Sequence, residues 1–191
     1  GQFAVIQATL EPYSDGDEEY AFESQISGGA IPKEYIKPVD DGVREAMSNG
    51  VLAGFPTVNI KVTLTDGKTH DVDSSEMAFK IAGNAWFREV APRCKPTLLE
   101  PMMAVEVVTP DDYLGDVVGD MNSRRGQVQG TEQRGQNQVV NALVPLSEMF
   151  GYSTDLRSRT QGRATYTMQF DSYQPTPANV QEEIVARVRG E

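Results

Sequence analysis

The chain has 191 residues, of which 39% are hydrophobic and 24% charged, ordinary values for a soluble globular protein that forms one large or two small domains. Its formal net charge of −11 argues against a general nucleic-acid binder held by bulk electrostatics, and no apolar run approaches the roughly 18–20 residues that a membrane span requires. Cys94 is the only cysteine and His70 the only histidine, which excludes an internal disulfide and a zinc site built from His and Cys ligands.

The first predicted elements are two strands separated by a turn. Residues 2–10 alternate between two faces as a strand does, and residues 12–17 supply turn-forming side chains. Residues 20–26 then predict the returning strand. The chain begins at Gly1, without a Met, directly inside this alternation, so we expect it to be a piece of a longer protein.

A helix is predicted next. Gly28-Gly29 breaks the second strand, and a helix can begin at Pro32, because a proline in the first turn loses no intrahelical hydrogen bond. Pro38 lies within the first turns, where it bends or delays the helix, and Asn49-Gly50 ends it. The apolar stripe repeats every four residues and consists of Tyr35, Val39, Val43 and Met47.

A third strand and a second helix complete the first half. Alternation over residues 58–64 predicts a half-buried strand, which Asp66-Gly67 closes. Asp73 with Glu76 three residues later is typical of a capping box, so both are expected to cap a helix that runs through about Val90. We expect the stripe that faces the core to be Met77, Ile81 and Ala85.

The second half predicts a single βαββαβ unit. Pro92 and Pro96 bracket the expected domain boundary, and Cys94 between them is expected to be buried or inert. The element order is that of a ferredoxin-like split βαβ sandwich, and a further helix follows Pro177. The predicted strands cover residues 103–109, 127–133, 138–144 and 165–170, and the predicted helices start at Pro110 and Pro145.

Positive charge gathers in one part of this acidic chain. Residues 121–164 contain six arginines and three acidic residues. Such arginines are usually salt-bridge partners, but the planar guanidinium also suits phosphate, so a local RNA contact stays open. The arginines are Arg124, Arg125, Arg134, Arg157, Arg159 and Arg163.

Six motifs in the same order resemble bacterial-type translation elongation factor G, and the resemblance covers the whole chain. In the first half they are GGAIPKEYI at 28–36 and HDVDSSEMAFK at 70–80. In the second half they are GDMNSRRG at 119–126, PLSEMFGY at 145–152, DLRS at 155–158 and TQGR at 160–163. One departure is Phe3-Ala4-Val5, which stands where many relatives have Tyr-Gly-His, so any role of that second histidine does not carry over.

The resemblance implies an α+β fold with two domains. Residues 1–95 would form domain IV of the factor, a ribosomal-protein-S5-domain-2-like βαβ domain that is truncated at its N-terminus. It would lack the first strand and one Gly-rich tip loop. Residues 96–174 would form domain V, a ferredoxin-like βαββαβ sandwich, and residues 175–191 a C-terminal helix that packs back near domain IV.

The resemblance also implies a function in translation elongation. Elongation factor G promotes GTP-dependent translocation of tRNA and mRNA, and its nucleotide-binding domain lies upstream of these domains. This chain has no Gly-rich loop ending in Gly-Lys-Ser/Thr, so we expect no cofactor and no catalysis here, with GTP and Mg²⁺ bound by that other domain. The expected partner is the ribosome, through rRNA, stalk-base proteins and the tRNA–mRNA at the decoding site. We further expect a cytoplasmic monomer with no membrane partner.

The candidate contact residues fall into two groups. His70, with Lys68 and Asp71, should lie on an exposed turn that the resemblance places at the decoding-site tip. An imidazole there can hydrogen-bond a 2′-hydroxyl or a phosphate, and the start of the next helix adds positive potential. No serine or cysteine nucleophile is paired with His70, which disfavours a general-base role. The second group has two possible roles, salt bridging and rRNA contact, and comprises Arg124, Arg125, Arg157, Arg159 and Arg163.

Other functions remain as alternatives. A ribosome-recycling or ribosome-protection paralogue shares these domains and differs mainly at the tip loops. A stand-alone enzyme on a ferredoxin-like fold would need a cluster of polar catalytic groups, which the sequence does not show. A plain RNA- or protein-binding α+β module is the remaining possibility.

Overall fold

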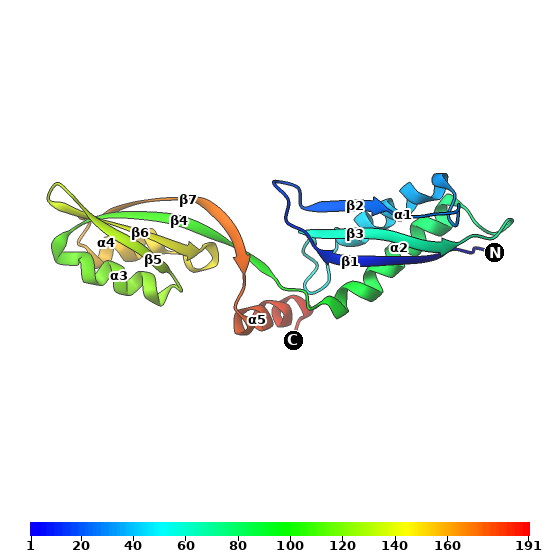
Figure 1. Ribbon diagram of the computed structural model, residues 1–191. Helices are drawn as coiled ribbons and strands as arrows, with labels where there is room; N and C mark the ends of the chain where they lie inside the picture. Colours follow the sequence, from blue (N-terminus) through cyan, green and yellow to red (C-terminus); the bar gives the residue numbers. More distant parts are fainter. The chain divides into compact units, whose positions relative to one another are not determined.

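The computed structural model describes all 191 residues and divides into two compact units (Figure 1). Unit 1 contains Gly1–Thr97 together with Asn179–Glu191, and unit 2 contains Leu98–Ala178. Each unit has its own sheet with helices packed on it, which confirms the α+β class. None of the helices has both the length and the apolar character needed to cross a membrane.

The sheet of unit 1 has the order β1-β3-β2. Strand β1 (Val5–Pro12) is antiparallel to β3 (Ile60–Lys68), and β2 (Tyr20–Ser24) is parallel to β3. The second strand therefore runs back opposite to the first, as predicted, but β3 lies between them, so the two strands do not form a hairpin. Strand β3 is the most buried of the three, with Val62 and Leu64 fully covered, and the central place in the sheet gives it neighbours on both edges.

Two helices pack against each other and against this sheet (Figure 1). Helix α1 (Lys33–Met47) forms the crossover between the parallel strands, and its predicted stripe is confirmed because Val39, Val43 and Met47 are buried. Helix α2 (Glu76–Val90) crosses it closely. A Cβ atom at Gly42 of α1 would lie 2.0 Å from the carbonyl oxygen of Lys80, and one at Gly83 of α2 would lie 2.4 Å from that of Val39.

The predicted core stripe of α2 is wrong. Met77 is 56% exposed and Ile81 47% exposed, and Ala85 is exposed as well. The buried positions are Ala78, Phe79, Gly83 and Phe87. The helix has more than one apolar stripe, and the small side chains at 78 and 83 allow the close approach to α1 that decides which one is buried.

Two boundary predictions near the start of α2 are also wrong. The N-cap is Ser75, whose Oγ accepts from the backbone N–H of Ala78 at 3.1 Å, so Asp73 lies outside the helix. The pair Asp66-Gly67 does not close β3, which continues to Lys68. Gly67 is buried there, and a Cβ atom would lie 2.4 Å from both the carbonyl oxygen of Val5 and the side chain of Ile31.

The sheet of unit 2 is antiparallel with the order β5-β6-β4-β7, which confirms the ferredoxin-like βαββαβ prediction. Its strands are β4 (Leu99–Pro110), β5 (Gln127–Arg134), β6 (Asn137–Pro145) and β7 (Thr165–Pro175). Helices α3 (Leu114–Ser123) and α4 (Tyr152–Arg159) lie on one face of this sheet (Figure 1). They enclose a core that includes Val105, Val117, Val140 and Tyr152.

Short 3₁₀ turns account for the remaining differences between the predicted and the observed helix boundaries. The helix expected at Pro145 begins at Tyr152, because Leu146–Glu148 forms a 3₁₀ turn and Gly151 adopts a left-handed conformation with φ of 75°. Similar turns cover Ala91–Cys94 and Asp111–Tyr113. Cys94 is exposed, so of the two expected alternatives, a buried or an inert thiol, burial is wrong. The last helix is α5 (Ala178–Arg189).

Candidate functional site

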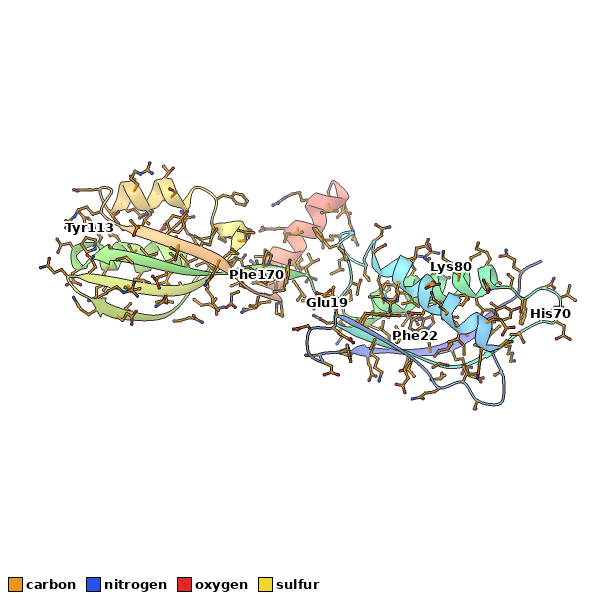
Figure 2. All side chains as sticks on the ribbon, turned by 90° about the horizontal axis from the view of Figure 1, so that it is seen from above. Glu19, Phe22, His70, Lys80, Tyr113 and Phe170 are labelled. Atoms are coloured by element: carbon orange, nitrogen blue, oxygen red, sulfur yellow. The ribbon has the colours of Figure 1, made fainter.

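The turn between β3 and α2 presents His70 and Asp71 to solvent, and Lys68 at the end of β3 is exposed as well. Figure 2 shows His70 at an extremity of unit 1. The position follows from local structure, because β3 ends at Lys68 and α2 starts at Glu76, and the segment between them turns the chain at the end of the sheet. Half of the His70 side chain, 50%, is exposed. The structure therefore places His70 and Asp71 in one turn and Lys68 at the strand end that leads into it.

The His70 ring is held in one orientation by its own turn. Nδ1 accepts hydrogen bonds from the backbone N–H groups of Val72 and Asp73, each at 3.2 Å. A neutral imidazole that accepts at Nδ1 carries its proton on Nε2. The carboxylate of Asp73 also lies 3.4 Å from Nδ1, but it can pair only with a protonated Nδ1, which would lose both backbone bonds. We assign the neutral form with the proton on Nε2, because it satisfies both amides.

This orientation determines what His70 offers to a partner. The Nδ1 lone pair is occupied, so the ring is a poor general base through that atom. The Nε2–H group has no partner within the chain and is available as a donor. Asp71 beside it is an exposed carboxylate acceptor. Such a donor can hydrogen-bond the oxygen of a ribose 2′-OH, and an exposed carboxylate of the same turn can accept from a hydroxyl.

Two residues that were not among the predicted contact residues hold this turn in place. The backbone N–H of His70 donates to Ser74 Oγ at 2.8 Å, and Ser74 Oγ–H donates to the carbonyl oxygen of Phe3 at 2.8 Å. The backbone N–H of Phe3 donates to the carbonyl of Asp73 at 2.9 Å, and the Phe3 ring centroid lies 5.9 Å from that of His70. Phe3 and Ser74 are 71 positions apart, so no local pattern could reveal their contact.

The charged side chains around this turn do not favour binding of a phosphate group. Lys68, the last residue of β3, is the only lysine within residues 66–75, whereas Asp66, Asp71 and Asp73 are acidic. Salt-dependent attraction to a phosphate backbone requires a cluster of basic side chains. The turn is therefore suited to recognition through hydrogen-bonding groups that are held in fixed positions.

Arg124 in unit 2 has a structural role. It caps the end of α3 and is 9% exposed. Its guanidinium pairs with Asp120 at 3.0 Å and with Asp155, and it donates to the carbonyl oxygen of Glu148 at 2.7 Å. It also lies 4.9 Å from the ring centroid of Tyr152. These contacts occupy its donors within the chain and favour the salt-bridge role over contact with RNA.

Arg125 is also engaged within unit 2. It follows α3 in the chain and has a left-handed backbone with φ of 56°. Its guanidinium makes a bidentate ion pair with the Glu100 carboxylate, with N–O distances of 2.8 and 3.0 Å. Glu148 accepts from its Nε at 3.3 Å. Hydrogen bonds to Glu100 raise the pKa of the Arg125 guanidinium above its ordinary value. Glu100 is itself buried, so this pair ties the end of α3 to β4.

The remaining predicted arginines lie around the C-terminal end of α4. Arg157 is exposed and makes no ion pair. Arg159 faces Asp120 at 3.4 Å, and Arg163 lies 5.7 Å from the ring centroid of Tyr113, which Figure 2 labels at one end of unit 2. The chain turns back here because Gly162 is left-handed with φ of 76° and its N–H donates to the carbonyl of Arg157 at 2.8 Å. We name Arg157, Arg159 and Arg163 the α4 arginine group.

No group of three or more His, Cys, Asp or Glu side chains is arranged to hold a metal ion. A cavity of about 450 Å³ lies between the C-terminal parts of α1 and α2, away from the His70 turn. It is lined by residues that include Glu45, Asn49, Asn84, Phe87 and Arg88.

Comparison with known proteins gives the same family over both units. Residues 1–95 match the family model described as elongation factor G, domain IV, and residues 97–184 match that described as elongation factor G C-terminus. A crystal structure of a protein from Thermus thermophilus is similar, with 35% identity and a TM-score of 0.81. The match covers 98% of this chain and 31% of that one, so the chain spans less than half of the length of that protein. The chain belongs to the elongation factor G family, of which it carries domain IV and the C-terminal domain.

Proposed function

We propose that this chain is the ribosome-binding part of a translational GTPase that promotes translocation of tRNA and mRNA. The observation that carries the proposal is the outward Nε2–H donor of His70 on an exposed turn, with Asp71 as a neighbouring acceptor. Membership of the elongation factor G family supports it. The turn would contact the sugar–phosphate backbone of the tRNA–mRNA complex through these two groups.

We propose that GTP and Mg²⁺ bind in another domain of the full-length protein. The sequence contains no loop whose backbone N–H groups and lysine would cradle nucleotide phosphates. This chain then contributes to the reaction cycle by coupling GTP hydrolysis in that other domain to the movement of tRNA and mRNA on the ribosome.

His70→Ala in the full-length protein is expected to slow single-turnover translocation about fivefold, the factor that one lost hydrogen bond to a neutral hydroxyl implies. Ribosome-dependent GTP hydrolysis should be nearly unchanged, because the nucleotide is bound elsewhere. Rapid-mixing fluorescence of labelled tRNA or mRNA measures the first rate, and phosphate release measures the second.

Thr69→Ala is the matched control for that variant, because Thr69 is exposed, adjoins His70 and makes no side-chain hydrogen bond. It should translocate at the wild-type rate. Wild-type translocation by His70→Ala would remove His70 from the mechanism. Slower subunit splitting with normal translocation would favour the recycling paralogue instead.

The α4 arginine group is proposed as a contact to large-subunit rRNA. Arg157→Ala should weaken ribosome binding of the full-length protein and lower the slope of log affinity against log salt by about 1, as expected for one lost phosphate contact. Arg134→Ala is the control, because Arg134 is already paired with Glu106 and Glu132. Binding assays across a salt series test this, and an unchanged slope in Arg157→Ala would contradict it.

A further inference from the structure

We infer that Ser74 is the positioning residue that fixes the tautomer and orientation of His70. The inference rests on the proposed function, in which the Nε2–H group of His70 meets an acceptor on RNA. It adds a residue that acts through His70 and does not itself touch the partner.

The hydroxyl of Ser74 links two segments that are far apart in the sequence. It accepts from the N–H of His70 and donates to the carbonyl oxygen of Phe3, both at 2.8 Å. A second bond, from the N–H of Ser74 to the carbonyl of His70 at 3.2 Å, closes the turn from inside. The start of the turn is therefore attached to the chain segment that leads into β1.

This attachment sets the geometry at the imidazole. The N–H groups of Val72 and Asp73 reach Nδ1 only while the turn is closed, because both donors belong to the turn itself. Those two bonds place the proton on Nε2 and direct it outward. Without the hydroxyl the turn would lose the bond from the His70 N–H and one of its two bonds to Phe3, and only the bond from the Phe3 N–H to the Asp73 carbonyl at 2.9 Å would still join the two segments. We expect this single link to let the imidazole exchange between tautomers and rotamers.

Ser74 is not needed to begin the helix. The N-cap of α2 is Ser75, whose Oγ accepts from Ala78 at 3.1 Å, and the Ser74 hydroxyl makes no bond to α2. The two consecutive serines therefore have separate roles. This separation supplies a matched control, because Ser75→Ala removes the helix cap and leaves the Ser74 link intact.

The experiment uses nitrogen-15 NMR of the imidazole. His70 is the only histidine of the 191-residue chain, so its ring signals need no assignment. In alkaline buffer, in which imidazole is neutral, the wild-type chain should show an unprotonated Nδ1 and a protonated Nε2. Ser74→Ala should give averaged shifts of the two tautomers and exchange of the His70 amide about fivefold faster or more, the factor for one lost hydrogen bond.

Two further variants distinguish a loss of His70 positioning from a general loss of structure in unit 1. Ser74→Thr keeps the hydroxyl and should keep the single tautomer. Ser75→Ala should also keep it, although it lowers the stability of α2 by about 1 kcal/mol, a typical cost of losing a cap. Unchanged signals of the buried Val39 and Leu64 methyl groups show that unit 1 remains folded in each variant. A single tautomer and a protected amide in Ser74→Ala would overturn the inference.

Translocation assays with the full-length protein then distinguish the two proposals. Ser74→Ala should slow translocation as His70→Ala does, and the double variant should be no slower than His70→Ala alone. Normal translocation by Ser74→Ala beside slow His70→Ala would overturn the positioning role. If neither variant slows translocation while the tautomer changes, the positioning by Ser74 stands and the proposed role of His70 falls.

Discussion

Gly42→Ala is expected to lower the free energy of unfolding of unit 1 by about 2 kcal/mol, because the added methyl group meets backbone atoms. Its Cβ would lie 2.0 Å from the carbonyl oxygen of Lys80 and 2.9 Å from the backbone N of Asn84. A backbone cannot rotate away as a flexible side chain can, so α1 and α2 must separate. Their separation loosens the buried contacts of Val39, Val43 and Phe87 with the sheet.

The single tryptophan provides the measurement. Trp86 lies on α2 against the core of unit 1, so its fluorescence reports the unfolding of that unit alone. A loss of about 2 kcal/mol should lower the midpoint of its thermal transition by about 9 °C for a unit of this size.

Gly119→Ala is the matched control, because it is the same substitution in a helix where no atom lies within 4 Å of the new Cβ. It should stabilise unit 2 by about 0.5–1 kcal/mol through helix propensity alone. A Gly42→Ala variant that unfolds at the wild-type temperature would contradict the close crossing of α1 and α2.

The second large effect is expected from Arg124→Ala, which should destabilise unit 2 by about 3 kcal/mol. The Asp120 side chain is only 5% exposed, and Arg124 is its closest cation at 3.0 Å. Removing the guanidinium leaves a buried carboxylate with Arg159 at 3.4 Å as the remaining partner. The bonds to Asp155 and to the carbonyl oxygen of Glu148 are lost as well.

Arg157→Ala is the control for this variant, because it removes an exposed arginine of the same unit that makes no ion pair. Its effect on stability should stay within about 0.5 kcal/mol. Urea unfolding followed by the NMR signals of the buried Val117 and Val140 methyl groups measures unit 2, while Trp86 fluorescence should remain at the wild-type midpoint.

A double-mutant cycle identifies the buried charge as the cause. Asp120→Asn combined with Arg124→Ala should be less destabilised than the sum of the two single variants, because the amide carries no charge to leave unpaired. Additive effects would show that Arg124 acts through packing over Tyr152 and not through Asp120.

The same pair of arginines shows why contact residues are hard to choose from a sequence. Arg124 and Arg157 belong to the same locally positive stretch and are equally consistent with phosphate binding. The fold brings Asp120, Asp155 and the carbonyl of Glu148 around Arg124, while it leaves Arg157 in solvent. Their difference depends on partners up to 31 positions away.

The sequence by itself determined the features that depend on neighbours along the chain. The buried stripe of α1, the βαββαβ order of unit 2 and the exposed turn at His70 all follow from local periodicity and turn chemistry. The motifs also identified the family, which the comparisons show.

Only the tertiary structure decided the features that depend on distant partners. It placed β3 between β1 and β2, buried Gly83 of α2 in place of Met77 and Ile81, and brought Phe3 to Ser74. Periodicity records which side chains are apolar, whereas close packing and paired polar groups select among the faces and partners that are locally equivalent. For the His70 turn, the sequence therefore showed an exposed histidine, and the tertiary structure alone showed which of its nitrogens faces outward.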